Sequence, residues 1–115
     1  MTRRDTGREG EDDAVDYLTK KGYRILRRNY RFGRGEIDII AEDGDTLVFV
    51  EVKSRIGGIG LPEEAVTERK RRQLATVAEG YLMKHDIGEK DCRFDVVAIF
   101  RKGGQTEIRH LSNIF

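Results

Sequence analysis

The chain is 115 residues long, with 37% hydrophobic residues, 37% charged residues and a formal net charge of +1. This length predicts one domain, residues 1–115, that can bury a core without disulfides or a structural metal. The patterned apolar runs exclude an intrinsically disordered chain, and none of them is long enough to span a membrane.

The first predicted element is a helix over Thr6–Lys21. Thr6 and Glu9 fit a capping box, and Gly22 is a typical helix stop. Glu11 recurs at helical spacing with the apolar residues of one stripe. Its carboxylate is therefore expected on the inward-facing side of this helix.

Three strands are expected next, over Tyr23–Phe32, Glu36–Glu42 and Thr46–Ser54. A tight glycine turn separates the first two, and Asp43-Gly44 is a strong hairpin signal between the second and the third. The segment Tyr23–Gly35 carries five arginines and no acid. Such a segment either contacts phosphate or is a solvated face.

The second half of the chain is expected to hold one long helix and two more strands. The predicted elements are a glycine-rich loop over Ile56–Leu61, a short helical turn from Pro62 through Val66, a helix from the N-cap Thr67 to about His85, and strands over Arg93–Arg101 and Thr106–Leu111. The order αβββαββ predicts an α/β fold in which helices flank a mixed sheet.

Charged residues interrupt the apolar second and third strands, where a core favours apolar side chains. Asp38 lies within Ile-Asp-Ile-Ile, and Glu51 and Lys53 lie within Phe-Val-Glu-Val-Lys. Because side chains alternate faces along a strand, Glu51 and Lys53 point the same way. Asp95 interrupts the fourth strand in the same manner, and a hydrogen bond to the backbone or to Arg93 is its expected role.

The hairpin loop sets how these charges face one another. A Gly44-Asp45 loop places Asp38 directly opposite Glu51. An Asp43-Gly44 loop places Asp38 opposite Phe49, with Glu51 as its diagonal neighbour. Either loop keeps the three charged groups on one face, whereas a loop of odd length would separate them unless a bulge restored the register.

This grouping favours a divalent-metal site for phosphodiester chemistry, because charges are seldom buried unless they are paired or bind a metal. Without a cation the two carboxylates repel, and one of them tends to take up a proton. The alternative is that Glu51 and Lys53 are solvent-facing charges on an edge strand. His85 and His110 lack metal-ligand spacing, and no role is predicted for them.

Four segments resemble one known family. They read GREGEDDAVDYL, RGEIDII, VFVEVKSR and RFDVVAI, and together they extend over nearly the whole chain. The pattern is similar to the YraN-type family of predicted endonucleases, which is distantly similar to archaeal Holliday-junction resolvases of the PD-(D/E)xK superfamily. The resemblance implies a restriction-endonuclease-like core and a metal-dependent endonuclease. Ile37 stands where a proline often precedes the motif aspartate.

The superfamily motif maps onto Asp38 and Glu51-Val52-Lys53. The resemblance implies that Mg²⁺ or Mn²⁺ is bound by both carboxylates and by the backbone carbonyl of Val52, with Glu11 as a further metal ligand. Lys53 would orient or help to deprotonate the attacking water and stabilise developing negative charge. Glu11 could instead form a salt bridge with an arginine of the first strand.

The expected partner is DNA, with branched DNA such as a Holliday junction as one candidate substrate. Contacts to it are expected from Arg31, Arg34, Arg55, Lys70 and Gln73, although residues such as Lys70 and Gln73 are more often helix surface or cap partners. The resemblance also implies a homodimer. The alternatives are a nucleic-acid-binding module of the same fold that cleaves nothing, and an interaction protein with no nucleic-acid role.

The chain has a single cysteine, Cys92, which cannot form an internal disulfide and so fits a reducing compartment. No apolar segment typical of a signal peptide is visible near the N-terminus. We therefore expect a cytoplasmic protein that does not associate with membranes.

Overall fold

The computed structural model describes residues 3–56 and 67–114, with the backbone alone for residues 3–9, 55 and 56. The expected loop after Ile56 and the short helical turn over 62–66 lie outside the described residues. The elements are α1 (Arg3–Lys20), β1 (Arg24–Phe32), β2 (Gly35–Asp43), β3 (Thr46–Ile56), α2 (Glu68–Lys84), β4 (Cys92–Lys102) and β5 (Gln105–Leu111). Neither helix is long and apolar enough to cross a membrane.

The five strands form one sheet in the order β1-β2-β3-β4-β5. The β3–β4 pair is parallel, because α2 lies between these strands in the chain and returns it to the same end of the sheet. The other three pairs are antiparallel and joined by tight turns. The predicted α/β class, the element order and the mixed sheet are therefore confirmed.

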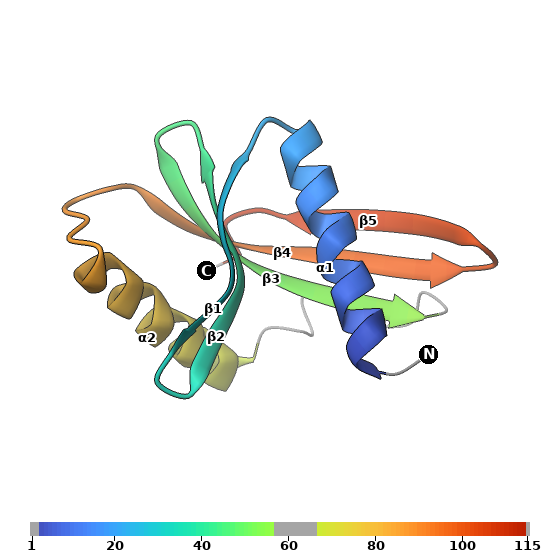
Figure 1. Cartoon of the computed structure of the whole chain (residues 1–115), viewed down its shortest axis with the longest axis horizontal. Helices are drawn as coiled ribbons and strands as arrows, with labels where there is room; N and C mark the ends of the chain where they lie inside the picture. Colours follow the sequence, from blue (N-terminus) through green and yellow to red (C-terminus); the bar gives the residue numbers. More distant parts are fainter. Residues whose placement is uncertain (1–2, 57–66, 115) are drawn as a thin grey trace.

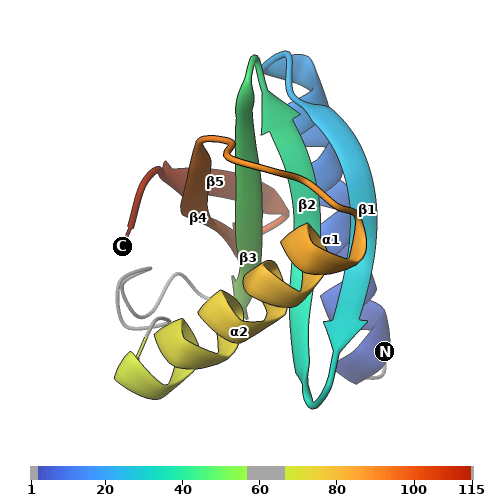
Figure 2. The ribbon, with the colours of Figure 1, turned by 90° about the vertical axis from the view of Figure 1, so that its left-hand side faces the viewer.

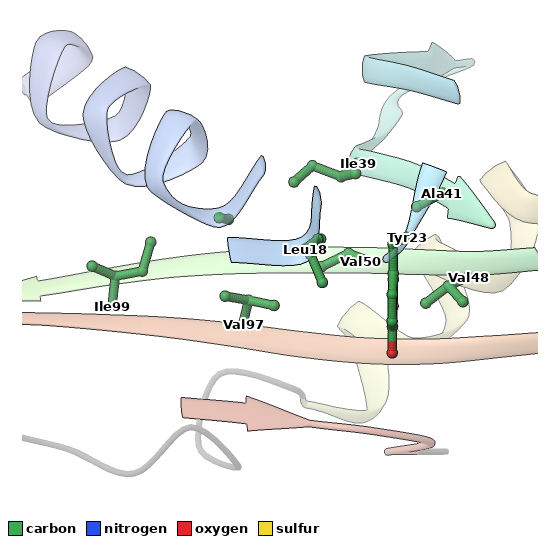
Figure 3. Close-up of a cluster of buried hydrophobic side chains, with 9 residues drawn as sticks. Leu18, Tyr23, Ile39, Ala41, Val48, Val50, Val97 and Ile99 are labelled. Carbon is green, nitrogen blue, oxygen red and sulfur yellow. The ribbon is translucent and has the colours of Figure 1, made fainter. Parts of the chain in front are cut away.

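The two helices cover opposite faces of the sheet (Figure 1), and a view from the side places α2 in front of the strands and α1 behind them (Figure 2). Each helix buries its own apolar cluster. The cluster under α1 includes Leu18, Ile39, Val50 and Val97 (Figure 3). The cluster under α2 comprises the buried residues Ile37, Ile40, Leu47, Phe49, Leu74, Val77, Ala78 and Tyr81.

The helix boundaries give one confirmation and one correction. Thr67 caps α2, since its side-chain oxygen accepts a hydrogen bond from the Lys70 backbone N–H at 3.1 Å. The predicted cap at Thr6 is wrong, because α1 begins at Arg3 and Thr6 lies inside it. No proline or glycine stands between Arg3 and Thr6 to stop the helix from extending toward the N-terminus.

The strand ends differ from the predicted ends by a residue or two. The largest difference is in β3, which continues to Ile56 rather than ending at Ser54. Its parallel pairing with β4 explains the extension, because Ile56 still has a partner in Arg101.

The tip of the β1–β2 hairpin, residues 31–35, packs closely on α2. A Cβ atom built on Gly35 would overlap the Cγ2 methyl of Val77, and one built on Gly80 would come within 2.6 Å of the Phe32 ring. Each glycine thus lets a neighbouring side chain approach the backbone of the opposite element. These contacts fix the position of the hairpin tip relative to α2.

We predict that Gly35→Ala destabilises the protein by roughly 1–3 kcal/mol, because Val77 is fully packed and cannot move aside freely. Urea unfolding monitored by circular dichroism measures this loss. The double variant Gly35→Ala with Val77→Ala should lose less than the sum of the two single variants. Strictly additive losses would show that the Gly35–Val77 contact is not the cause.

Candidate metal centre

The β2–β3 hairpin has the first of the two predicted registers. Asp43 pairs with Thr46 across a Gly44-Asp45 loop, and the pairing runs in step as far as Ile39 opposite Val50. Asp38 on β2 and Glu51 on β3 each lie one residue beyond this last pair. The turn chemistry of the sequence therefore places the two carboxylates on neighbouring strands.

The regular alternation of β2 is interrupted at Asp38. Ile37 packs in the cluster under α2, whereas Ile39, two residues later, packs in the cluster under α1. This break between Ile37 and Ile39 is not indicated by the sequence. The Asp38 carboxylate nevertheless reaches β3, where its Oδ2 accepts a hydrogen bond from the Val52 backbone N–H at 2.8 Å.

Glu51 is the most unusual acid of the site, because its side chain is only 6% exposed. Its Oε1 lies 3.6 Å from the Nζ of Lys53 and 3.4 Å from the Nζ of Lys70. Its Oε2 is buried without any hydrogen-bond partner. An unsatisfied buried carboxylate oxygen is costly, so this atom is suited to binding a cation.

Asp38 shows the repulsion expected of crowded carboxylates. Burial raises the pKa of Asp38 to about 7, and the negative charge of Glu51 adds to this effect. The hydrogen bond from Val52 opposes the rise, while Glu11 and Glu36 contribute to it. A carboxyl group that takes up a proton near neutral pH is the state expected of this pair without a cation.

Glu11 lies near Asp38 but is engaged elsewhere. Its Oε1 accepts hydrogen bonds from Arg28 Nε at 3.0 Å and from Asn29 Nδ2 at 2.9 Å. The salt bridge to an arginine of the first strand, which the sequence left open, is therefore present. The role of Glu11 as a metal ligand stays a prediction.

The Asp38–Glu51 pair fits a hydrated divalent cation better than a closed protein cage. Among the described residues, no three His, Cys, Asp or Glu side chains converge as a metal-binding cluster. Mg²⁺ needs only one or two protein carboxylates, because it retains several waters and binds substrate phosphate. The unpartnered oxygen of Glu51 beside Asp38 meets that requirement.

The residues expected to contact nucleic acid lie on two elements that meet. Arg31 and Arg34 are exposed on the hairpin tip, and Arg31 Nε lies 3.9 Å from Glu36 Oε2. Lys70, on the first turn of α2, is partly exposed, and its ammonium group forms an ion pair with Glu51. The side chain of Arg55 lies outside the described residues.

The first two turns of α2 carry a second basic cluster of the sequence, Arg69–Arg72. Gln73 lines a groove together with Arg69, Arg72 and Thr76. The backbone carbonyl of Gln73 also lies against Gly35 of the hairpin tip. The predicted contact residues Gln73 and Arg34 are thus brought to the same region of the molecule.

Asn29 is a residue of the site that sequence reasoning missed. It has a left-handed backbone with φ 53°, and the β1–β2 register places it opposite Asp38. Asparagine is depleted in strands and adopts the left-handed conformation more readily than most residues. An asparagine inside an otherwise strand-like run is therefore the signal that could have revealed it.

Asp95 takes part in a buried network on β4, where it pairs with Val50 of β3. Arg93 donates to both of its oxygens, at 2.9 and 3.1 Å, and the Asn113 backbone N–H donates at 2.9 Å. Nε2 of His110 lies 2.7 Å from Oδ2. Burial alone would raise the pKa of Asp95, yet these bonds hold it below its usual value. The predicted Arg93 partner is confirmed, whereas the part played by His110 was not foreseen.

Sequence comparison identifies the family of the chain. The model of the uncharacterised protein family UPF0102 matches residues 10–99. The chain belongs to the UPF0102 family. UPF0102 proteins of Persephonella marina and Symbiobacterium thermophilum are each 49% identical to it, over 95% and 100% of this chain and 91% and 98% of their own lengths. A UPF0102 protein of Prosthecochloris aestuarii is 48% identical over 96% of this chain and 93% of its own.

For this UPF0102 protein we predict that Asp38→Asn stabilises the cation-free fold above neutral pH. The pKa of Asp38 rises from 3.8 to about 7 on folding, so wild-type stability falls as pH increases from about 4 to 7. Without the charge, the variant should gain roughly 1–3 kcal/mol at pH 8 and nothing below pH 4. Chemical unfolding in EDTA across this pH range measures the difference.

Asp16→Asn is the matched control, because Asp16 is exposed on α1 and forms a surface ion pair with Lys20. It should leave the pH profile unchanged. A stability gain for Asp38→Asn that is constant with pH, or largest in acid, would contradict the assigned repulsion.

Proposed function

We propose that this UPF0102 protein is a metal-dependent endonuclease with a restriction-endonuclease-like core, which hydrolyses phosphodiester bonds in DNA. The observation that carries the proposal is the buried, unpartnered Oε2 of Glu51 beside the crowded carboxyl of Asp38. Two lysine ammonium groups lie within 3.6 Å of the other Glu51 oxygen. Carboxylates that bind a cation, next to amines that stabilise negative charge, suit phosphodiester hydrolysis.

Each side chain of the centre has a distinct part in this proposal. Asp38 and Glu51 would hold Mg²⁺ or Mn²⁺, which neutralises charge on the scissile phosphate and makes a water more acidic. Lys53 is partly exposed beside Glu51, so its ammonium can orient the attacking water and stabilise the developing charge. The backbone N–H of Val52 keeps the Asp38 carboxylate directed at β3.

The substrate assignment to DNA rests on the basic residues beside the centre. Exposed arginines lie on the hairpin tip and on the first two turns of α2, two elements that pack together through Gly35 and Val77. Positive groups on two adjoining elements suit contact with the phosphate backbone of DNA, and the resemblance to Holliday-junction resolvases makes branched DNA such as a four-way junction the first candidate.

The test is cleavage of labelled linear and four-way DNA in Mg²⁺ or Mn²⁺. Asp38→Asn and Glu51→Gln should each lower the cleavage rate by about a hundredfold or more, because each removes a charged group of the reaction centre. Asp16→Asn should cleave like the wild type. Equal cleavage by wild type and Asp38→Asn would mean a contaminating nuclease or a different site.

A non-catalytic nucleic-acid-binding module is the second candidate, and the α2 groove lined by Arg69, Arg72 and Gln73 favours it. If these arginines contact phosphates, their replacement by alanine should reduce the slope of log K against log salt by about two. Fluorescence anisotropy with labelled DNA in EDTA measures this slope.

Lys84→Ala, an exposed change at the other end of α2, is the control for this measurement and should leave the slope unchanged. Salt-dependent binding without nicking in any divalent metal would select the binding module over the nuclease. An unchanged slope in the arginine variant would show that the groove does not contact phosphate.

A further inference from the structure

The two outer strands of the sheet differ in how their free edges are protected. Within the described residues, β1 pairs only with β2, and β5 pairs only with β4. The β1 edge has a bulge at Leu26 and a left-handed residue at Asn29, and it carries several arginines. Such features prevent a strand edge from pairing with another chain.

The β5 edge has neither a bulge nor a left-handed residue, and Arg109 is its only arginine. Its seven residues pair with β4 in unbroken register, from Val96 opposite Leu111 to Lys102 opposite Gln105. The strand contains no proline, glycine or lysine. Figure 1 shows β5 at the border of the sheet, with its outer edge turned away from the neighbouring strands. Half of its backbone N–H and C=O groups therefore face outward, available to a further strand.

The charges on β5 would face opposite charges if two copies of the strand paired antiparallel. Glu107 and Arg109 lie two residues apart and so share one face of the strand. Their side chains are 63% and 48% exposed, and Arg109 Nε lies 3.2 Å from Glu107 Oε1. In an antiparallel pair of two β5 strands centred on Ile108, each Glu107 is opposite the Arg109 of the other copy.

The same charges disfavour the neighbouring registers. A two-fold axis perpendicular to the sheet keeps paired side chains on one face, so the pairing must be centred on a single residue. Centring on Glu107 places that carboxylate opposite its own copy, and centring on Arg109 does the same with two guanidinium groups. Like charges directly opposite one another destabilise a strand pair, so the register centred on Ile108 is preferred.

We propose that two copies of this chain associate through antiparallel pairing of their β5 edges, centred on Ile108, to form one continuous sheet. The axis leaves α2 over the same face of the joined sheet in both copies. If the proposed nuclease function holds, the two Asp38–Glu51 centres then lie on that one face, related by two-fold symmetry. The interface itself does not depend on that function.

The test is an exchange of charges, read by sedimentation equilibrium of the full chain without metal or DNA. Glu107→Arg and Arg109→Glu should each weaken dimerisation by roughly tenfold or more, because each places two like-charged pairs in the interface. An equimolar mixture of the two variants should restore dimerisation to at least the wild-type level. In the mixed pair, every charge again faces its opposite.

Glu79→Arg is the matched control, since Glu79 is exposed on α2 and does not belong to β5. It should dimerise like the wild type. A wild-type protein that stays monomeric at millimolar concentration would overturn the proposal, as would single variants with unchanged association or a mixture without rescue. Because no cleavage is measured, this result is independent of the nuclease test.

Discussion

The carboxylate of Glu51 is the constraint on which the rest of the site depends. A strand that runs through the middle of the sheet carries a buried acid, with one oxygen beside two ammonium groups and the other without a partner. Hydrophobic packing alone would favour an apolar residue here, as at the neighbouring positions Val50 and Phe49. The cost of burying this charge would be offset by a cation bound at Oε2, and such a cation would link the stability of the strand to the proposed chemistry.

The surrounding fold explains how this arrangement is held in place. The crossover through α2 brings Lys70 over β3, and the cap at Thr67 fixes where that helix begins. Glycines at Gly35 and Gly80 allow the hairpin tip to pack against the same helix. The basic residues of the tip and of α2 are thus positioned by the core that surrounds Glu51, rather than by independent surface loops.

Sequence reasoning predicted most of the fold because its signals are local. The Asp43-Gly44 turn signal and the alternating apolar residues predicted the hairpin, and the charged residues within it indicated the candidate site. The break in alternation at Asp38 could not be predicted, because it depends on the packing of Ile37 and Ile39 against different helices. The partners of Glu11 and His110 were also hidden, since they come from contacts between residues distant in the chain. The start of α1 was missed because a plausible cap motif occurs inside a longer helix.

We propose above that a divalent cation binds between Asp38 and Glu51. The most direct measurement is a crystal soaked in Mn²⁺, with the anomalous scattering peak located. We expect a peak within coordination distance of oxygens from both carboxylates, beside the Lys53 ammonium. A peak only at other acids, such as Asp45, Glu89 and Asp91 around their shared pocket, would contradict it. So would the absence of any peak between the two strands at saturating metal.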